Sequence, residues 1–320
     1  MKAGSDDDGR RLDRILRKAL QDLPLSAIHR LLRQGEVIVD GEKAGADYRV
    51  KAGQTISITG AADINLLKKS SRPGNEVKGS CKREAAGKDE NLSILFEGAG
   101  LLILNKPAGI PVHGKNSLED LVLKYLLPRL PPSLSFRPGP LHRLDLPSSG
   151  VIAFSSSIEG ARFFSASLRE RKIKKLYLAI VEGEIAEAEE WQDELSRDTS
   201  LKKSFAGNKE ASGKSPPLAA KTAITRVRPL AKSRSYTLIT ADIETGRTHQ
   251  IRSQAALHGH PLLGDKKYGS KTPNRGRFYL HAWRMELPYA PELPSRIEAP
   301  LPDDFIKTIE ELFGEDLEDT

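Results

Sequence analysis

The pattern of apolar and polar positions divides the chain into a small N-terminal block and a larger block behind it. In the small block, apolar side chains recur at helical spacing over residues 12–20 and again over residues 27–34. This spacing predicts two short amphipathic helices, each with one face in a core. We expect Ser26 to cap the start of the second helix, and Gly35 to end that helix in the left-handed conformation.

β-Strands are predicted directly after these helices. Residues 36–45, EVIVDGEKAG, alternate apolar and polar side chains and contain Asp40–Gly41, a pair that favours a two-residue hairpin turn. Residues 49–59, RVKAGQTISIT, predict one further strand. Residues 10–60 are therefore predicted to form a small α/β domain.

The larger block, residues 92–315, contains more strand-like runs than helical ones. The runs typical of strands are residues 92–98, 100–107, 150–156, 175–183, 221–230, 235–244 and 278–288. The helical patterns are residues 118–127, 158–171, 248–259 and 303–313. Because strands and helices do not alternate strictly, we predict an α+β domain whose mixed, largely antiparallel β-sheet is flanked by helices and loops, and not a doubly wound parallel sheet.

Two polar stretches interrupt these patterns. Residues 61–91 join the two blocks, and from residue 68 onward they have almost no large apolar side chain, a composition typical of a linker. Residues 197–217 are similarly polar and are predicted to be a surface insertion in the larger domain. The predicted order is a small domain, a linker and a large domain.

Charge and cysteine content narrow the class of protein. The 320 residues include 50 Lys and Arg against 43 Asp and Glu, a formal net charge of +7, which suits a polyanionic partner such as nucleic acid. The single cysteine, Cys81, excludes an internal disulfide framework and a cysteine-rich zinc site. The first residues lack the apolar core of a signal peptide, and no run approaches the ~18 apolar residues of a membrane span. We therefore expect a protein of the cytoplasm, with no membrane partner.

Basic residues gather on the two predicted helices of the small domain. Between Arg10 and Gly35 the chain has seven Lys or Arg and only two Asp. Arginines on the polar face of a helix suit the phosphate groups of a nucleic acid. The candidates for this contact are Arg11, Arg14, Arg17, Arg30 and Arg33. Charge alone leaves open the alternative that these are solvated helical faces.

Three polar clusters in the larger domain are candidates for chemistry. Residues 141–150, LHRLDLPSSG, place Asp145 at the mouth of an apolar strand, where it either caps a turn or lies at the floor of a site with Arg143 directed at a ligand. Tyr177 lies within an apolar strand, either as a core residue or as a group that stacks on a base or moves a proton.

The third cluster is residues 244–269, ETGRTHQIRSQAALHGHPLLGDKKYG. Thr248 is a candidate N-cap for a helix through His258, with Gly259 as its left-handed end and Arg252 four residues after the cap. Three histidines in this stretch invite a metal site, but their spacing matches no familiar zinc motif and no cysteine assists. We therefore predict no metal.

Together these motifs resemble the RluA-type family of pseudouridine synthases. That family's His-Arg-Leu-Asp-x-x-Thr-Ser-Gly hallmark is matched by residues 142–150, with Ser148 in the place of threonine. A Lys-x-Tyr-x-Ala signature is matched by residues 175–179, and Gly-Arg-x-His-Gln-Ile-Arg and Gly-His-Pro-x-x-Gly-Asp by residues 246–252 and 259–265. The segment LNKPAGIPVHG is also similar, although Gln254 stands where the family often has histidine. Residues 10–60 resemble the small RNA-binding domain first named from ribosomal protein S-four.

The resemblance implies an RNA-modifying isomerase with no cofactor. It implies that Asp145 is the nucleophile or anion stabiliser, that Arg252 pairs with it, and that Tyr177 packs on the uracil and is a candidate base for the proton on carbon 5. The target nucleotide must be flipped out of its stack, and Arg143 would fill the gap that it leaves. The further substrate-binding candidates are His142, Arg247 and His249.

The resemblance also limits the substrate. Family members with the added N-terminal domain mostly act on large-subunit ribosomal RNA, which makes 23S rRNA the first expectation and transfer RNA the alternative. A non-catalytic RNA-binding ribosome-assembly factor would be the alternative from another class, but such a protein need not retain Asp145, Tyr177 and Arg252 together. We expect a monomer that binds RNA and not DNA.

Overall fold

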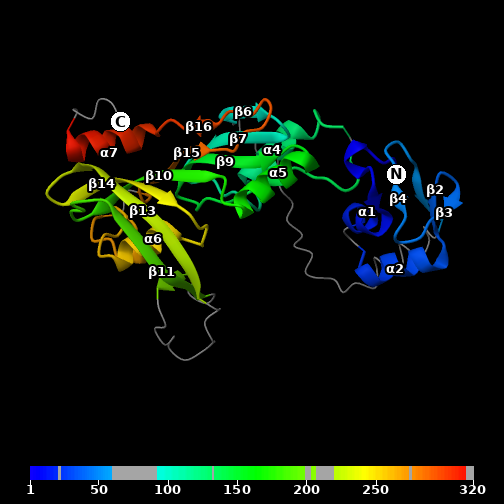
Figure 1. The fold of residues 1–320 in the computed structure, drawn as a ribbon, viewed down its shortest axis with the longest axis horizontal. Helices are drawn as coiled ribbons and strands as arrows, with labels where there is room; N and C mark the ends of the chain where they lie inside the picture. The colour runs from blue at the N-terminus through cyan, green and yellow to red at the C-terminus, as the bar shows by residue number, and fades with distance from the viewer. Residues whose placement is uncertain are drawn as a thin grey trace, which may run out of the picture. The chain divides into compact units, whose positions relative to one another are not determined.

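The structure is a computed structural model that describes residues 1–20, 23–59, 92–131, 133–198, 203–206, 220–273 and 276–314. The chain forms two compact units. The first contains the N-terminal residues together with Leu123–Gly139 and Ser156–Ile158, and the second contains Leu92–Val122, Pro140–Ser155 and the residues from Glu159 onward. Figure 1 shows the elements of each unit.

The N-terminal unit combines two helices with two small sheets. Its elements are η1 (Ser5–Asp7), β1 (Arg10–Arg11), α1 (Leu12–Ala19), α2 (Leu25–Gln34), β2 (Val37–Val39), β3 (Glu42–Lys43), β4 (Arg49–Val50) and β5 (Ile56–Ile58). β1 pairs with β4, and β2 lies between β3 and β5, all antiparallel. Buried residues of α1 and α2, such as Leu16 and Leu31, share one core with Val37 and Ile56.

The two predicted helices of this unit are confirmed, but the second begins earlier than predicted. α2 starts at Leu25 behind Pro24, so Ser26 lies inside the helix and is not its cap. Pro24 has φ −65° and ψ 149°, and its carbonyl accepts hydrogen bonds from Ala27 and Ile28. Proline suits a helix start because its ring already fixes φ near the helical value. Gly35 ends the helix with φ 67° and ψ 26°, as predicted.

The hairpin at Asp40–Gly41 is confirmed, whereas the single strand predicted over residues 49–59 is wrong. Asp40 and Gly41 both have positive φ and connect Val39 to its partner Glu42. A turn separates β4 from β5, because Gln54 donates from its backbone to Lys51 and Gly53 has φ +88°. The two short strands consequently join different sheets.

A buried carboxylate connects the N-terminus to a later segment of the same unit. Asp7 is fully buried and accepts backbone hydrogen bonds from Leu134 and Ser135, both at 2.9 Å. The Ser135 hydroxyl also bonds to Asp7 and receives a bond from Arg10 at 2.8 Å. Leu134 packs against the unit's core. The N-terminal unit therefore includes later segments of the chain as well as its first residues.

The second unit is organised around a sheet of 11 strands, ordered β12-β11-β13-β14-β10-β15-β9-β7-β6, with β16 beside β15 and β8 beside β9. The strands are β6 (Ile94–Gly98), β7 (Leu101–Lys106), β8 (Gly139–Pro140), β9 (Ser149–Ser155), β10 (Lys174–Glu182), β11 (Glu189–Asp198), β12 (Lys203–Ala206), β13 (Lys221–Lys232), β14 (Tyr236–Ile243), β15 (Leu280–Glu286) and β16 (Arg296–Glu298). The helical elements after residue 92 are α4 (Leu118–Leu126), α5 (Ile158–Arg169), α6 (Gln250–Leu257), η2 (Lys266–Tyr268) and α7 (Asp303–Phe313). The end of α4, from Leu123, and the first residue of α5 belong to the first unit.

The predicted α+β class and its mixed, largely antiparallel sheet are confirmed. Consecutive strands along the main path pair antiparallel except β15 and β9, which pair parallel through His281 and Ser149. The predicted strands and helices of the larger domain are present. β8, β11, β12 and β16 were not predicted. β11 is mostly charged and buries only a few side chains, such as Trp191.

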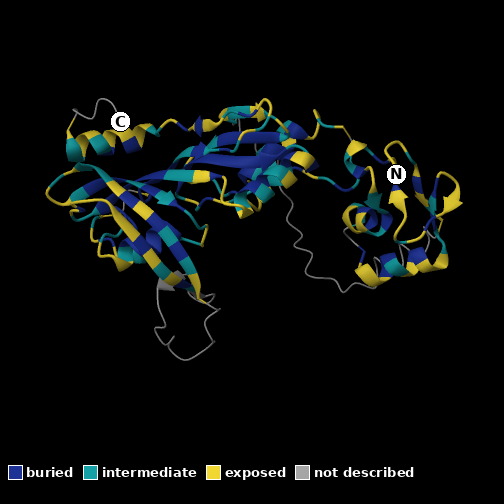
Figure 2. Ribbon diagram, viewed as in Figure 1, coloured by how far each residue is buried: buried dark blue, intermediate teal, exposed yellow. Residues whose placement is uncertain are grey.

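Two apolar clusters cover parts of this sheet. One joins α5, through Phe164, to β7, β9 and β15. The other joins α7, through Phe305, to Leu178 and Ile180 of β10 and to β14. Figure 2 shows buried residues concentrated on the central strands β7, β9 and β10. Tyr177 faces the opposite side of β10 from Leu178, because side chains alternate along a strand.

The predicted linker, residues 61–91, and most of the predicted insertion, residues 197–217, lie outside the described residues. Within the insertion, β12 pairs with the end of β11. No helix in the described part of the chain has the length and apolar character needed to cross a membrane.

Candidate active site

Asp145 lies on the loop that leads into β9, and hydrogen bonds to its backbone carbonyls hold this loop in place. The Asp145 carbonyl accepts a hydrogen bond from the Ser148 backbone, which closes a turn. Lys106, at the end of β7, donates from Nζ to the carbonyls of Leu146 at 3.2 Å and Ser148 at 2.7 Å. The Leu146 carbonyl also accepts from Gly109. Asp145 therefore both starts a turn and projects from a rigid loop.

Lys106 is a buried cation held by oxygen atoms. Its side chain is 0% exposed, and its third hydrogen bond goes to the Pro107 carbonyl at 2.9 Å. Burial lowers the pKa of Lys106 to about 8, although the negative charge of Asp145 acts in the opposite direction. Lys106 thus holds the loop through its hydrogen bonds to the Leu146 and Ser148 carbonyls, and it places a positive charge near Asp145.

Arg252 reaches the site from the first turn of α6. This helix begins one residue later than predicted: His249, in the left-handed conformation with φ 55°, occupies the N-cap position in place of Thr248. The Gln250 side chain accepts hydrogen bonds from the Thr245 hydroxyl and the Arg247 backbone, which ties the preceding loop to the helix. Gly259 follows the helix with φ +87°, which confirms the predicted left-handed end.

Arg252 contacts two carboxylates. Its Nη1 donates to Oδ2 of Asp145 at 2.8 Å, and its Nε and Nη2 donate to the two oxygens of Asp265 at 2.7 and 2.9 Å. Arg252 also stacks over Phe278, with 4.2 Å between the guanidinium carbon and the ring centre. Because charge-assisted bidentate pairs restrict geometry strongly, Asp265 orients Arg252 toward Asp145.

His249 contacts the other oxygen of Asp145. Its Nε2 lies 3.8 Å from Oδ1 of Asp145, and its Nδ1 lies 2.9 Å from the Tyr268 hydroxyl. Burial lowers the pKa of His249 to about 4, with Asp145 opposing the shift. His249 is therefore neutral at neutral pH and can act there as a hydrogen-bonding group without adding charge.

Tyr177 completes the floor of the site from β10. Its side chain is 7% exposed, and burial together with the charge of Asp145 raises its pKa. The neutral phenol is thus strongly favoured over the phenolate. A neutral phenol can pack on a base and donate a hydrogen bond, but it cannot accept a proton without passing on its own.

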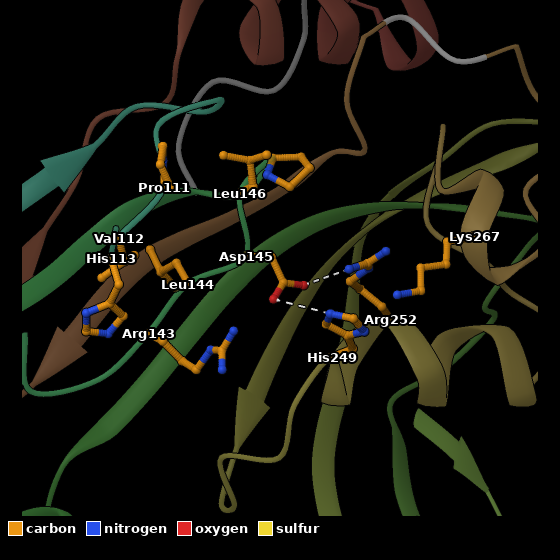
Figure 3. A pocket seen from close by; sticks show the side chains of 11 residues that line it. Pro111, Val112, His113, Arg143, Leu144, Asp145, Leu146, His249, Arg252 and Lys267 are labelled. Atoms are coloured by element: carbon orange, nitrogen blue, oxygen red, sulfur yellow. Dashed lines mark hydrogen bonds and ion pairs between the residues drawn. The ribbon is translucent and has the colours of Figure 1, made fainter. Parts of the chain in front are cut away.

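These residues line a cavity that opens above Asp145. One part is lined by Pro111, Val112, His113, Arg143, Leu144, Asp145, Leu146, Pro147, His249, Arg252 and Lys267. A second part, which shares Arg143, Asp145 and Arg252 with the first, adds Tyr177 and Arg247. Figure 3 shows Asp145 at the centre, linked to Arg252 and His249, with Arg143 and Lys267 on opposite sides. Leu146 is 51% exposed and, like Pro111, lines the cavity.

The structure brings most of the predicted site residues together. Asp145, Tyr177, Arg252, Arg143, Arg247 and His249 all line the cavity. His142 is not among its lining residues: its ring stacks on Phe164 at 5.9 Å, and its Nε2 accepts a hydrogen bond from the Ala153 backbone. Burial and the charge of Lys175 lower the pKa of His142 to about 3. His142 thus anchors β9 behind the loop that carries Asp145.

The predicted RNA-binding arginines lie in the N-terminal unit. Arg14, Arg17, Arg30 and Arg33 are exposed on α1 and α2. Arg11 instead makes two hydrogen bonds to Asp13, at 3.1 and 2.9 Å. These bonds, followed by the charge of Asp13, raise the pKa of Arg11.

Sequence reasoning missed two residues that shape the site. Asp265 stands out in the sequence only as the end of a Gly-His-Pro-x-x-Gly-Asp motif, and Lys106 only within LNKPAGIPVHG. A usable signal exists for each of them. Lys106 ends an apolar strand that would otherwise bury no charge, and Asp265 follows the tight turn at Gly264, where the backbone has φ +82°. An isolated buried charge normally implies a partner.

Comparisons with known proteins match two parts of the chain to family models. The model of the RNA pseudouridylate synthase family matches residues 100–257, and that of the S4 domain matches residues 10–56. Ribosomal large subunit pseudouridine synthase C of Vibrio vulnificus (strain CMCP6) is 32% identical over 95% of this chain and 93% of its own length. This chain belongs to the RNA pseudouridylate synthase family. The protein of the same description from Escherichia coli (strain K12) is 31% identical over 96% of this chain and 94% of its own.

A solved structure supports the fold of this pseudouridine synthase. The human protein described as RNA Pseudouridylate Synthase Domain Containing 4 superposes with a TM-score of 0.57, at 22% identity over 69% of this chain and 92% of its own. The chain is thus an isomerase of RNA, and it carries an S4 domain ahead of the catalytic fold. The recognised RluA-type resemblance is confirmed.

Proposed function

We propose that this pseudouridine synthase modifies uridines of 23S rRNA in the large ribosomal subunit, with Asp145 as the reacting carboxylate. The position of Asp145, on a rigid loop in a cavity and 2.8 Å from Arg252, carries this proposal. The names of the relatives, both described as acting on the ribosomal large subunit, support the choice of RNA. The S4 domain match supports an RNA partner.

The reaction needs a uridine that has been flipped out of the RNA helix. It also needs a group that stabilises the uracil and the ribose while the bond between them is broken. Isomerisation breaks the bond from uracil N1 to ribose C1′ and forms one from C5 to C1′, while C5 loses a proton and N1 gains one. Asp145 would attack or stabilise the electron-poor carbon, and Arg252 would hold it in place. Arg143, exposed beside Asp145, would occupy the space left by the flipped base.

Other residues would bind and position the uridine. Tyr177 would pack against the uracil ring, and its raised pKa favours a hydroxyl that relays a proton over a free phenolate base. Arg247 and the neutral His249 would hydrogen-bond to the nucleotide from the loop before α6. His142 would contribute indirectly, by anchoring β9 behind Arg143.

We propose a division of labour along the chain. Residues 10–60 would bind RNA through Arg14, Arg17, Arg30 and Arg33, residues 61–91 would act as a linker, and residues 92–315 would hold the catalytic domain. Arg11, engaged by Asp13, would contribute less than its neighbours. We further propose that the enzyme works as a monomer in the cytoplasm.

The test is to map pseudouridines in RNA from cells with and without the gene. We expect one or more uridines of 23S rRNA to lose modification when the gene is deleted, and to regain it with the wild-type gene but not with Asp145→Asn. Loss confined to transfer RNA would replace the proposed substrate. No loss in any RNA would overturn the proposed function.

A further inference from the structure

Two adjacent lysines at the start of β10 have opposite surroundings. Lys174 forms an ion pair with Glu286, with 3.5 Å between Nζ and Oε2. Lys175 points to the other face of the strand, the face that carries Tyr177. On that face no described residue gives Lys175 an ion pair or a hydrogen bond. Lys175, two residues before Tyr177, is thus a cation without an ion-pair or hydrogen-bond partner among the described residues.

The ammonium group of Lys175 lies against the loop that carries Arg247. A Cβ on Gly246 would lie 3.8 Å from its Nζ, so the missing side chain leaves room for this approach. Lys175 is half-buried, and burial lowers its pKa with no carboxylate acting against the shift. Its charge also contributes to the lowered pKa of His142, the residue before Arg143. A partly buried cation is normally paired, because losing water costs free energy.

The uncompensated charge extends beyond Lys175. Arg143 and Arg247 line the cavity, and within the described residues neither forms an ion pair. Arg252, by contrast, is bonded to two carboxylates. Arg143 and Arg247 of the cavity wall, together with Lys175 beside Gly246, therefore form a local excess of positive charge with no ion pair among the described residues. Lys175 itself is not among the residues that line the cavity. Uracil and ribose are neutral, so the only anion that an RNA substrate brings to the site is a backbone phosphate.

We propose that Lys175 binds the phosphodiester next to the flipped uridine. The phosphate would enter between the Gly246 loop and the start of β10, and would supply the negative partner that the free enzyme lacks. Lys175 would then hold the extruded nucleotide over Tyr177 without touching the reacting atoms. This inference rests on the proposed function, because it requires an RNA substrate in the cavity.

The experiment compares Lys175→Met with Lys174→Met, its neighbour on the opposite face. Turnover and half-saturating concentration are measured on a transcript of 23S rRNA at several salt concentrations. For Lys175→Met we expect the half-saturating concentration to rise about tenfold, and the log–log salt slope to flatten by roughly 0.7 to 0.9, as for one lost phosphate contact. Turnover at saturation should change by less than about twofold. Lys174→Met should match the wild type, and Lys175→Arg should retain most of the affinity.

A chemical substitution in the RNA gives a second readout that needs no altered protein. A short RNA that carries the target uridine is made with a neutral methylphosphonate on its 5′ or its 3′ side. At one of these positions the wild type should lose as much affinity as Lys175→Met, and Lys175→Met should lose nothing further. Equal behaviour of both lysine variants, or additive losses at both positions, overturns the inference. A wild-type enzyme inactive on every RNA instead overturns the proposed function.

Discussion

Asp265 accepts two hydrogen bonds from Arg252, on the side of the guanidinium away from Asp145. Both members of this pair are buried, Asp265 at 2% exposed and Arg252 at 6%. The arginine consequently has one remaining nitrogen directed at Asp145. Asp265 therefore holds Arg252 in the position from which it reaches Asp145.

Asp265→Asn should lower kcat strongly. The variant keeps the shape of the side chain but loses one charge-assisted acceptor, so Arg252 shifts, and a displacement of about 1 Å can cost roughly 10²-fold in rate. Breaking a buried pair also costs about 3–5 kcal/mol of stability, so the melting temperature should fall. The matched control is Asp304→Asn, which removes the carboxylate partner of another buried arginine, Arg277, outside the cavity. Equal kcat values for the two variants would show that Asp265 does not position Arg252 for the reaction.

Asp145→Asn should abolish product formation in a folded protein that still binds RNA. The amide keeps the size of the carboxylate, but it is a poor nucleophile and carries no charge to stabilise a cation. Release of tritium from RNA labelled at carbon 5 of uridine measures the reaction directly. Filter binding and the melting temperature check that RNA affinity and folding persist. Tritium release at the wild-type rate would refute the assignment of Asp145.

Tyr177→Phe separates packing from proton transfer. The phenylalanine retains the ring that would lie against uracil, so RNA binding should be unchanged, whereas turnover should collapse if the hydroxyl relays the proton. Because the pKa of Tyr177 is raised, the wild-type rate should not climb between pH 7 and 9 as it would for a phenolate base. Tyr177→Leu should weaken binding as well. A fully active Tyr177→Phe enzyme would limit Tyr177 to packing.

Acid should destabilise the fold through buried histidines. His281 is 0% exposed, lies between the Ser149 hydroxyl and the Ala299 carbonyl, and has its pKa lowered to about 4 by burial. Below about pH 6.5 the unfolded chain binds a proton that folded His281 does not, so stability is full above that pH and falls toward pH 4. The loss should be about 2 kcal/mol between pH 7 and 5.

Urea unfolding at these two pH values measures the effect. His281→Asn can keep a donor and an acceptor but cannot titrate, so its stability should depend less on pH in this window. His113→Asn is the control, because this histidine is exposed and pairs only with Glu119 at the surface. His142, whose pKa is lowered to about 3, adds a similar dependence. An unchanged pH dependence in His281→Asn would contradict the prediction.

The exposed arginines of α1 and α2 should set RNA affinity without affecting chemistry. Changing Arg14, Arg17, Arg30 and Arg33 to Gln should raise the half-saturating RNA concentration and flatten the salt dependence by roughly 0.7 to 0.9 for each lost contact. Turnover at saturation should persist. This variant is preferable to deletion of residues 1–60, which would also remove the Asp7 partner of Ser135.

The control for the arginine variant keeps the same unit and removes charge elsewhere. Lys43 and Lys51 are exposed but lie outside the helices, and changing both to Gln should leave affinity nearly unchanged. An equal effect of both sets would point to general electrostatic attraction. No effect of the arginine set would show that the S4 domain does not dock RNA through these helices.

The sequence correctly predicted features that depend on neighbouring residues alone, such as a helix end and a hairpin turn. Gly35 and Asp40–Gly41 require positive φ, which their sequence signals directly. The starts of α2 and α6 were misplaced because their causes are different: the fixed φ of Pro24 begins one, and left-handed His249 precedes the other. β11 escaped prediction because its partners β12 and β13, and not its own apolar pattern, hold it in the sheet.

Sequence motifs identified most of the candidate site residues, but they did not predict which of these residues contact one another. Asp145 and Arg252 lie 107 residues apart, and only the tertiary fold brings their side chains within 2.8 Å. The link from Arg252 to Asp265 and the support of Leu146 by Lys106 likewise join separate strands and loops. No pattern of hydrophobic spacing reports such contacts.

Asp7 and Ser135 are 128 residues apart, and this separation determines when the N-terminal unit can be finished during synthesis. Helices α1 and α2 leave the ribosome early and can pack together at once. Asp7, however, remains solvated until its hydrogen-bond partners, within residues 133–135, have been synthesised and have left the ribosome. By then β6 and β7 have also been made, while β9, the partner of β7, has not. The nascent chain therefore passes through a stage in which both units are begun and neither is closed.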